Sequence, residues 1–242
     1  MDYKYKDKVV FITGASRGLG RYLCTYFAEK GAKVAATARD KGKLAELAAE
    51  IEEKGGEIFT YAGSVSDYDA MKEAASQTAE KWGRIDVLIN NAGVGFAKPM
   101  EEQSKEEIDA TIDTNIKGLI YVTQHVVKYM KEANKGHIFN ISSTVGIRGA
   151  GSSVYSATKF AVNGFSEGIS KNLLMENNIH VANLNPGGID TTWWDRNKYA
   201  TGKDNLIQPH DMARFIDFIL SNPENIFFKQ ALFFPTREMK YW

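Results

Sequence analysis

Hydrophobic and polar residues follow two alternating patterns along the chain. Short apolar runs, typical of buried parallel strands, are separated by longer segments with apolar residues at helical spacing. The predicted strands lie near residues 8–13, 33–38, 57–61, 86–89, 137–141, 179–184 and 231–234. The predicted helices lie at 18–29, 40–54, 66–82, within 104–133, at 155–176 and at 209–221. This alternation predicts an α/β fold: a doubly wound, seven-stranded parallel sheet with right-handed crossovers and helices on both faces.

The length of the chain favours one large unit over two. A chain of 242 residues matches the size of a single α/β domain, so we predict one domain over residues 1–242. Residues 187–207 are the least regular stretch and contain Trp193-Trp194. Because long irregular loops in compact domains are often functional, we expect a substrate loop there.

Composition and charge exclude several classes of partner. Thirty basic and thirty acidic residues give a net charge of zero, which argues against nucleic acid or an anionic membrane as partner. No apolar run approaches the ~20 residues needed to span a bilayer, and the N-terminal residues lead into the first strand without a signal segment. Cys24 is the only cysteine, which excludes an intramolecular disulfide. We therefore expect a cytoplasmic protein.

A glycine-rich turn joins the first strand to the first helix. Residues 14–20 read Gly-Ala-Ser-Arg-Gly-Leu-Gly. A strand, glycine turn and helix in succession direct backbone N–H groups and the positive end of the helix dipole at a phosphate. The spacing is G-x-x-x-G-x-G, and no Gly-Lys-Ser/Thr sequence follows that would make it a P-loop. Taken alone, the segment fits a phosphate site or an ordinary tight turn equally well.

Tyr155 and Lys159 are four residues apart, so on a helix they share one face. A phenol has an ordinary pKa of about 10 and is a poor base near pH 7. An adjacent ammonium favours the phenolate, and a pKa drop of 2–3 units would correspond to roughly 3–4 kcal/mol. The pair is therefore a candidate general acid/base, although such a spacing also arises by chance and needs support from the rest of the chain.

That support comes from further motifs. Together with the glycine turn, the Tyr155/Lys159 pair resembles the single-domain branch of the short-chain dehydrogenase/reductase family, which has a Rossmann-like fold. More motifs of that family follow in the expected order: Asn90-Asn91-Ala92-Gly93, Asp113-Thr114-Asn115-Ile116-Lys117-Gly118, Ile138-Phe139-Asn140-Ile141-Ser142-Ser143 and Pro186-Gly187-Gly188-Ile189-Asp190-Thr191. The resemblance covers residues 7 to about 195. It implies a nicotinamide-dependent oxidoreductase.

The resemblance also implies catalytic roles. Tyr155 would exchange a proton with the substrate oxygen, and Lys159 would lower the Tyr155 pKa and bind the nicotinamide ribose. The serine three residues before Gly146 is Ser143, so Ser143 rather than Ser142 would donate a hydrogen bond to the substrate carbonyl. The spacing from residue 143 to residue 155 is one shorter than in many relatives. Asn115 would hold a water that links Lys159 to solvent.

Cofactor contacts are likewise implied over several segments. The expected contacts come from Gly14, Ser16, Arg17, Gly18, Leu19, Gly20, Arg39, Ser64, Val65, Asn91, Ala92, Gly93, Tyr155, Lys159, Pro186, Gly187, Ile189 and Thr191. Relatives usually carry an Asp at the position of Ser64, where it contacts the adenine. We expect adenine binding in a weakened or rearranged form.

Cofactor choice is predicted from the end of the second strand. NAD enzymes place an Asp or Glu there to bind the ribose hydroxyls, and the family alignment puts Ala38 at that position. Arg39 follows it and Arg17 lies in the glycine turn, so two guanidinium groups could bind a 2′-phosphate. Asp40 would serve as ribose acceptor if the register slipped by two, but we interpret it as the cap of the next helix. We therefore predict that NADP(H) is preferred over NAD(H).

The predicted activity is the interconversion of a ketone or aldehyde carbonyl and an alcohol by an NADP(H)-dependent oxidoreductase. Within the family, a 3-oxoacyl-carrier-protein reductase or a hydroxysteroid dehydrogenase are alternatives. The C-terminus lacks the T-G-x-x-x-x-x-D-G-G ending typical of the former. A catalytically silent nucleotide-binding interaction protein is the non-enzyme alternative, which the intact Asn115, Ser143, Tyr155 and Lys159 disfavour. The length and the glycine spacing exclude a sugar-nucleotide epimerase of the extended branch.

Other features receive simpler interpretations. His125, His137, His180 and His210 are scattered without metal-ligand spacing, so we predict no catalytic metal. Trp193-Trp194 could line an apolar pocket or pin the loop to the body of the protein. The aromatic pairs at 227–228, 233–234 and 241–242 suggest a subunit interface, because aromatic residues are enriched at interfaces. We therefore expect a homodimer or homotetramer that acts on a small carbonyl or alcohol substrate.

Overall fold

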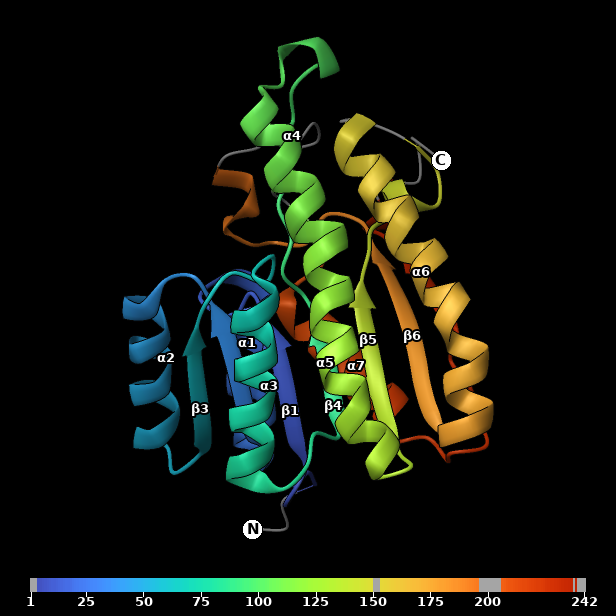
Figure 1. Cartoon of the computed structure of the whole chain (residues 1–242). Coiled ribbons are helices and arrows are strands. Elements are labelled where there is room, and N and C mark those ends of the chain that lie inside the picture. Colours follow the sequence, from blue (N-terminus) through green and yellow to red (C-terminus); the bar gives the residue numbers. More distant parts are fainter. Residues whose placement is uncertain (1–3, 150–152, 196–205, 237, 239–242) are drawn as a thin grey trace.

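The computed structural model describes residues 4–149, 153–195, 206–236 and 238, in which seven parallel strands form one sheet (Figure 1). The strands are β1 (Val9–Thr13), β2 (Lys33–Ala38), β3 (Glu57–Ala62), β4 (Val87–Asn90), β5 (Gly136–Ile141), β6 (Ile179–Pro186) and β7 (Gln230–Phe233). Their order is β3-β2-β1-β4-β5-β6-β7. The sheet therefore winds in opposite directions from β1, and the predicted doubly wound α/β fold is confirmed.

Helices cover both faces of the sheet. Figure 1 shows α3 (Tyr68–Trp82), α5 (Leu119–Glu132) and α6 (Ser153–Asn177) in front of the sheet, with α1 (Gly18–Glu29) and α7 (Pro209–Leu220) behind it. The helix α2 (Lys41–Glu53) packs in the same hydrophobic cluster as α1 and α7.

Successive residues of the central strand β1 supply the two hydrophobic cores. Val10 and Ile12 belong to the cluster with α1, α2 and α7, whereas Val9 and Phe11 belong to the cluster with α3, α5 and α6. This division follows from the two-residue period of a strand. All four side chains are fully buried, as expected for a strand covered on both faces.

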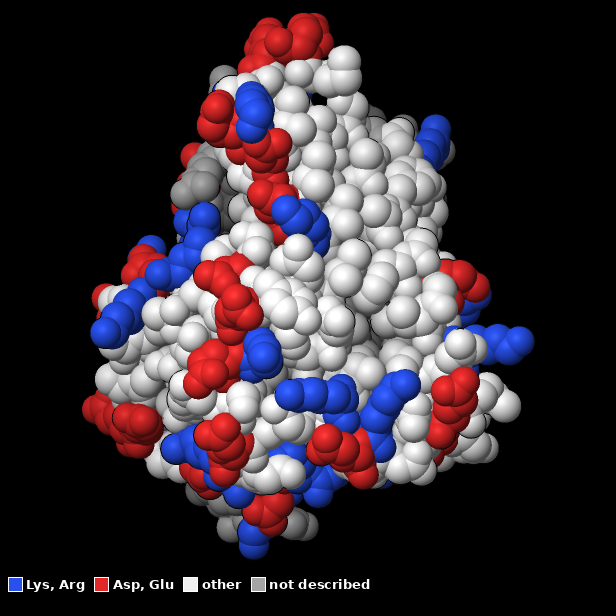
Figure 2. All heavy atoms as spheres, in the orientation of Figure 1, with Lys and Arg blue, Asp and Glu red and all other residues white. Residues whose placement is uncertain are grey.

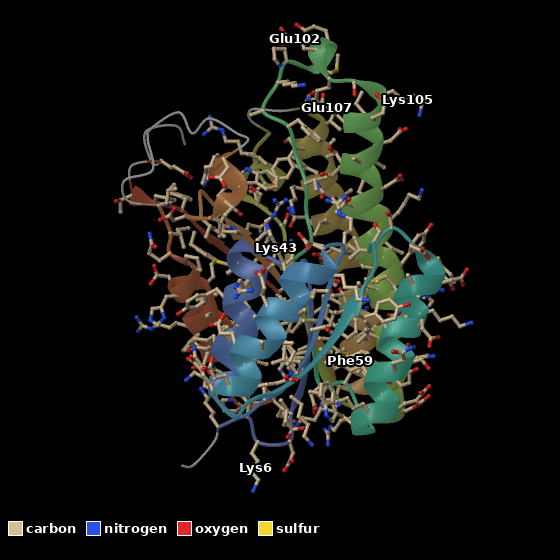
Figure 3. All side chains as sticks on the ribbon, turned by 90° about the vertical axis from the view of Figure 1, so that its left-hand side faces the viewer. Lys6, Lys43, Phe59, Glu102, Lys105 and Glu107 are labelled. Atoms are coloured by element: carbon tan, nitrogen blue, oxygen red, sulfur yellow. The ribbon has the colours of Figure 1, made fainter. Side chains whose placement is uncertain are left out.

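The single long helix predicted within 104–133 is divided in the structure. The helix α4 (Lys105–Ile112) leads into a π-helical segment (Asp113–Gly118), which continues into α5. Figure 3 shows α4 in side view, with Lys105 and Glu107 near its start and Glu102 beyond its tip. The π-helical turn widens the backbone around Asn115. A regular 3.6-residue pattern does not reveal such an insertion.

Capping residues fix the helix starts close to the predicted positions. The Asp40 carboxylate accepts a hydrogen bond from the Lys43 backbone N–H at 3.0 Å, so its predicted role as the cap of α2 is confirmed. Asp67 caps α3 in the same way through Ala70 at 3.0 Å. Gly83 ends α3 with a left-handed backbone, φ +77°.

The C-terminal aromatic residues pack within the chain. Phe233 lies 5.2 Å from Phe215 and Phe228 lies 5.7 Å from Phe218, measured between ring centroids. The ring of Phe227 contacts His180. These rings therefore have partners within the chain, and their place in a subunit interface stays a prediction. The pair 241–242 lies outside the described residues.

Two features are absent from the residues that the structure describes. None of the helices there has both the length and the apolar character needed to cross a membrane. Groups of three or more His, Cys, Asp or Glu side chains placed to hold a metal ion do not occur in that part of the chain.

Candidate active site

A cavity of about 590 Å³ lies at the carboxyl edge of the sheet, where the predicted motifs meet. Its walls come from the segments that follow β1, β2, β3, β4, β5 and β6, together with α6. Of the predicted catalytic and cofactor residues, only Gly20 and Asn115 are absent from the lining. Both lie behind it and shape it. Ligands bind at this edge in doubly wound sheets, at the point where the strand order reverses.

The glycine turn has the backbone that its sequence predicts. Gly14 and Gly18 both have positive φ, +69° and +55°, a region that favours glycine. A Cβ at Gly14 would lie 2.9 Å from the Ala92 Cα, and one at Gly20 would lie 2.5 Å from the Asn91 Nδ2. The turn therefore presses against the end of β4, and α1 begins at Gly18 beside the cavity. The site fits a dinucleotide phosphate at this helix start.

Asn91 locks this turn in place. Its side-chain Nδ2 donates to the Thr13 carbonyl at 2.9 Å, and its backbone N–H donates to the Thr13 hydroxyl at 3.0 Å. The Ala92 N–H donates to the same hydroxyl at 3.0 Å. The Asn-Asn-Ala-Gly segment thus holds the ends of β1 and β4 together, and this fixes the floor of the cavity.

The far end of the cavity carries two cations. Arg17 and Arg39 are exposed and line the cavity together with Ala38. Ala38 ends β2 and offers no acceptor to a ribose. Ser64 also lines this end, but its hydroxyl bonds the Ser66 hydroxyl at 2.8 Å. This part of the cavity suits an anion better than a neutral ribose edge.

Tyr155 and Ser143 meet inside the cavity. The Tyr155 hydroxyl is hydrogen-bonded to the Ser143 side chain, and Ser143 Oγ also accepts the Val145 N–H at 3.3 Å. Ser142 points elsewhere: it is buried and donates to the Lys159 carbonyl at 3.0 Å. Of the two adjacent serines, only Ser143 shares a hydrogen bond with the tyrosine. The short 143-to-155 spacing does not prevent this contact.

The electrostatics differ from the sequence-based expectation. Burial raises the pKa of Tyr155, and only the Ser143 hydrogen bond acts in the opposite direction. The Lys159 ammonium lies 5.5 Å from the Tyr155 ring centroid and donates to the Ile141 carbonyl at 2.8 Å. Burial lowers the pKa of Lys159 to about 8. The predicted lowering of the Tyr155 pKa is therefore wrong for this structure, because desolvation of the phenolate outweighs a cation that is engaged elsewhere.

Asn115 holds the wall beside these residues. Its Oδ1 accepts the Val94 N–H at 2.8 Å, and its Nδ2 donates to the Val94 carbonyl at 2.8 Å and to the Thr158 hydroxyl at 3.0 Å. A Cβ at Gly93 would lie 3.5 Å from Asn115 Oδ1 and 3.7 Å from Lys159 Nζ. Asn115 therefore lies near Lys159, but both amide hydrogens of its side chain are already used. Its role in holding a water stays a prediction.

The two tryptophans take different positions. The Trp193 ring lies 5.3 Å from the Tyr155 ring, centroid to centroid, at an interplanar angle of 46°. The Trp194 Nε1 donates to the Ile189 carbonyl at 2.7 Å. Both side chains line the cavity. Trp193 thus lies against the tyrosine, and Trp194 is bonded within the loop itself. The cavity-lining interpretation describes both residues, while the anchoring of the loop to the body of the protein stays a prediction.

Some lining residues were missed by the sequence analysis. A Cβ at Gly95 would lie 2.6 Å from Tyr155 Cδ2 and 3.0 Å from Trp193 Cη2, so this glycine makes room for both rings. Arg148 and Glu238 add charges from segments that carry no motif. Burial raises the pKa of Glu238, and its hydrogen bond from Gly188 works against that. Of these three residues, only Gly95 could have been found from the sequence, because it lies two residues after the Asn-Asn-Ala-Gly motif.

The doubly wound sheet, the glycine turn and the Ser/Tyr/Lys cluster form the arrangement expected of a dinucleotide-dependent oxidoreductase. The sequence profile of the short chain dehydrogenase family matches residues 8–201, and the chain belongs to that family.

Specific relatives agree with this assignment. The chain is 40% identical over 189 residues to the 3-oxoacyl-[acyl-carrier-protein] reductase FabG of Thermotoga maritima, covering 78% of this chain and 76% of the relative. A metagenomic short-chain oxidoreductase in complex with NADP is 30% identical, with a TM-score of 0.82 and coverage of 96% and 98%. The closed form of serine dehydrogenase complexed with NADP+ is 32% identical, with a TM-score of 0.83 and coverage of 93% and 94%.

Proposed function

We propose that this oxidoreductase uses NADP(H) to interconvert a ketone or aldehyde carbonyl and an alcohol, with Tyr155 as general acid/base. The observation that carries the proposal is the hydrogen bond between Tyr155 and Ser143. It lies in the wall of the cavity that also contains the glycine turn. The bond places two hydroxyl groups next to each other, and both could donate to a carbonyl oxygen that gains negative charge during reduction.

The roles of the side chains follow from their positions. Tyr155 would donate its proton to the substrate oxygen in reduction and take it back in oxidation. Ser143 would donate a second hydrogen bond to the same oxygen. Lys159 would hold positive charge behind the tyrosine, and with a pKa of about 8 it remains mostly protonated at neutral pH. The nicotinamide, when bound, supplies or accepts the hydride.

Two substrate classes within the family remain as alternatives. The similarity to FabG supports a 3-oxoacyl-carrier-protein reductase. The C-terminal sequence from Phe228 to Thr236 departs from the ending typical of those reductases. The aromatic rings of Phe96, Trp193 and Trp194 in the lining suit a substrate with an apolar substituent, as a hydroxysteroid dehydrogenase would need.

The decisive experiment is a carbonyl panel with NADPH, followed by loss of nicotinamide absorbance. We expect at least one aldehyde or ketone to be reduced by the parent. We also expect Tyr155→Phe to lose nearly all turnover, because it removes the proton donor, while its NADPH affinity by fluorescence titration stays within a few fold. Turnover of Tyr155→Phe within tenfold of the parent would reject the acid/base assignment. NADPH binding without reduction of any compound would favour the catalytically silent binding protein.

We also propose that the chain forms a homodimer or homotetramer in the cytoplasm. Figure 2 shows a broad area without charged side chains over the upper part of α6 and the neighbouring part of α5, while charged side chains lie over the lower ends of both helices. On α6, Phe160 is 45% and Met175 is 77% exposed, and a Cβ at Gly164 or Gly168 would meet nothing within 4 Å. Phe160, Gly164 and Gly168 recur every four residues on one face of α6, and such apolar and small residues allow close helix packing between subunits. The exposed Lys171 follows them on the same face, so the uncharged part ends there.

Light scattering tests this assembly. We expect Gly164→Arg to shift the parent's mass to that of a monomer, because the arginine would stand on the uncharged face. Glu53→Arg on α2 is the control and should leave the mass unchanged. A monomeric parent, or an unaltered mass for Gly164→Arg, would contradict the proposed interface.

A further inference from the structure

Several backbone groups of the loop that follows β6 are hydrogen-bonded to other segments. The Gly187 N–H donates to the Phe233 carbonyl at 2.8 Å, which extends the pairing of β6 with β7. The Ile207 N–H donates to the Gly188 carbonyl at 2.9 Å, and the Asp190 N–H donates to the Ile207 carbonyl at 2.8 Å. Between these contacts, the Gly188 N–H is bound by a side chain.

That side chain is Glu238, near the end of the chain. After β7 the backbone turns at Pro235, whose carbonyl accepts the Glu238 N–H at 2.8 Å. The turn brings the Glu238 carboxylate back over the loop, and Oε1 accepts the Gly188 N–H at 2.9 Å. Glu238 is also the one carboxylate among the described residues that line the cavity. Hydrogen bonds to an ionised acceptor are stronger than neutral ones.

The close packing of this turn depends on Gly187. A Cβ at Gly187 would lie 2.8 Å from Phe234 Cβ and 2.9 Å from Pro235 Cδ, and it would collide with Glu238 Oε2. The C-terminal segment therefore lies directly on the backbone of residues 187–188. Because a close-packed contact has no room to shift, a displacement of Glu238 would be transmitted to the loop.

The same loop also reaches the glycine turn. A Cβ at Gly18 would lie 3.3 Å from the Thr191 Cβ, so the loop contacts the start of α1 where both line the cavity. Glu238 holds one end of this loop and Thr191 meets the glycine turn at the other end. The C-terminal segment is therefore connected, through this loop, to the glycine turn.

We propose that Glu238 is a positioning residue, and that its hydrogen bond to Gly188 sets the loop of residues 187–191 in the geometry that binds the cofactor. The proposal rests on the proposed NADP(H)-dependent function. It extends the site beyond the motifs to the C-terminal segment. The carboxylate acts as a hydrogen-bond acceptor for the backbone and does not take part in proton transfer.

The test compares Glu238→Ala with Glu238→Gln. Glutamine keeps an acceptor for the Gly188 N–H and alanine removes it, while Glu167→Ala, which breaks an exposed ion pair with Lys229, serves as the matched control. We expect Glu238→Ala to weaken NADPH binding roughly tenfold or more by fluorescence titration. It should also raise the KM for NADPH more than it lowers kcat. Glu238→Gln and Glu167→Ala should stay within about threefold of the parent.

Hydrogen exchange gives a second measurement that needs no cofactor. In the cofactor-free protein, Glu238→Ala should speed the exchange of peptides covering residues 187–195 and leave those covering β1 and β2 unchanged. Glu238→Gln should restore slow exchange. Parent-like binding and exchange in Glu238→Ala, or a Glu238→Gln variant as weak as alanine, would overturn the proposal. If the parent itself binds no nicotinamide cofactor, the proposed function fails, and the exchange data alone then decide whether Glu238 positions the loop.

Discussion

The ring of Trp193 lies against the ring of Tyr155, with centroids 5.3 Å apart. The backbone of Gly95 lies against both rings, so a side chain at position 95 would collide with them. A substrate that approaches the Tyr155 hydroxyl must therefore share the cavity with the Trp193 indole. This contact places an aromatic wall beside the proposed acid/base and suggests that Trp193 limits the size of the substrate.

Trp193→Ala should shift the substrate preference toward bulkier carbonyl compounds. Removing the indole opens space beside Tyr155, and each methylene-sized change in such a pocket is worth about 1–3 kcal/mol of discrimination. We expect kcat/KM for a bulky ketone relative to a small aldehyde to rise at least roughly tenfold. Phe218→Ala, which removes a half-exposed ring of α7 outside the cavity lining, is the control. An unchanged ratio in Trp193→Ala would mean that the indole does not border the substrate.

Alanine substitutions of the two adjacent serines should have different effects, one on turnover and the other on the stability of the fold. Ser143→Ala should reduce kcat by about 10²–10³-fold, the usual loss for one transition-state donor. Ser142→Ala should leave kcat near the parent but lower the free energy of unfolding by about 1 kcal/mol, because its hydroxyl bonds the buried Lys159 carbonyl at 3.0 Å. Steady-state kinetics and urea unfolding measure the two effects. Reversed kinetic effects would show that the serine assignment is wrong.

His137 should make the fold sensitive to mild acid. Burial, with smaller effects from His180 and Lys135, lowers the pKa of His137 to about 4, whereas an unfolded histidine titrates near 6.5. Between about pH 6.5 and pH 4, His137 binds a proton in the unfolded chain but not in the folded one. The free energy of unfolding that this histidine contributes is therefore fully present above about pH 6.5 and is lost as the pH falls toward 4. The maximum loss is about 3 kcal/mol.

Urea unfolding at pH 7 and pH 5 tests this effect with His137→Phe. Phenylalanine can keep the ring stacking with His180, whose centroid lies 4.9 Å away, but it cannot titrate. The variant should lose less stability between the two pH values than the parent does. The nearby His180 and Glu224 also face this site, so part of the pH dependence should remain. An equal loss in both proteins would assign the acid sensitivity to other groups.

The sequence predicts the parts of the site that depend on local backbone chemistry. Gly14 needs a positive φ at the end of a buried strand, and Asp40 caps a helix, so both positions could be recognised from their neighbours in sequence. The π-helical turn at Asn115 could not, because the residues around it follow an ordinary helical pattern and the partner of Asn115, Val94, is distant in the chain. The position of Glu238 could not be predicted either, because its partner Gly188 is distant in the chain. A turn after the last strand brings Glu238 to the loop after β6.

The pKa of Tyr155 illustrates a different limit of the sequence. The spacing of Tyr155 and Lys159 correctly places both on α6 beside one cavity. It does not reveal how deeply the phenol is buried, or that the ammonium donates to the Ile141 carbonyl. Burial and hydrogen-bond partners are tertiary properties, and here they reverse the direction of the pKa shift.

Cofactor preference is the most specific prediction. Arg17 and Arg39 reach the cavity from the glycine turn and from the end of β2, and Ala38 offers no acceptor to the ribose. Asp40 does not compete for this role, because its carboxylate caps α2 at 3.0 Å from the Lys43 N–H. Two guanidinium groups bind a 2′-phosphate by charge-assisted hydrogen bonds, each worth about 1.5–3 kcal/mol.

We therefore expect kcat/KM for NADPH to exceed that for NADH by at least roughly 10²-fold, and the preference to weaken at high salt, which screens exposed charges. Ala38→Asp combined with Arg39→Ile should reverse the ratio, because the new carboxylate accepts the ribose hydroxyls and repels the phosphate. Arg17→Ala alone should weaken NADPH use and leave NADH use nearly unchanged. Lys43→Ala, on the exposed start of α2, is the control and should change neither. A parent that favours NADH, or a double variant that keeps the parent's ratio, would show that these two arginines do not select the cofactor.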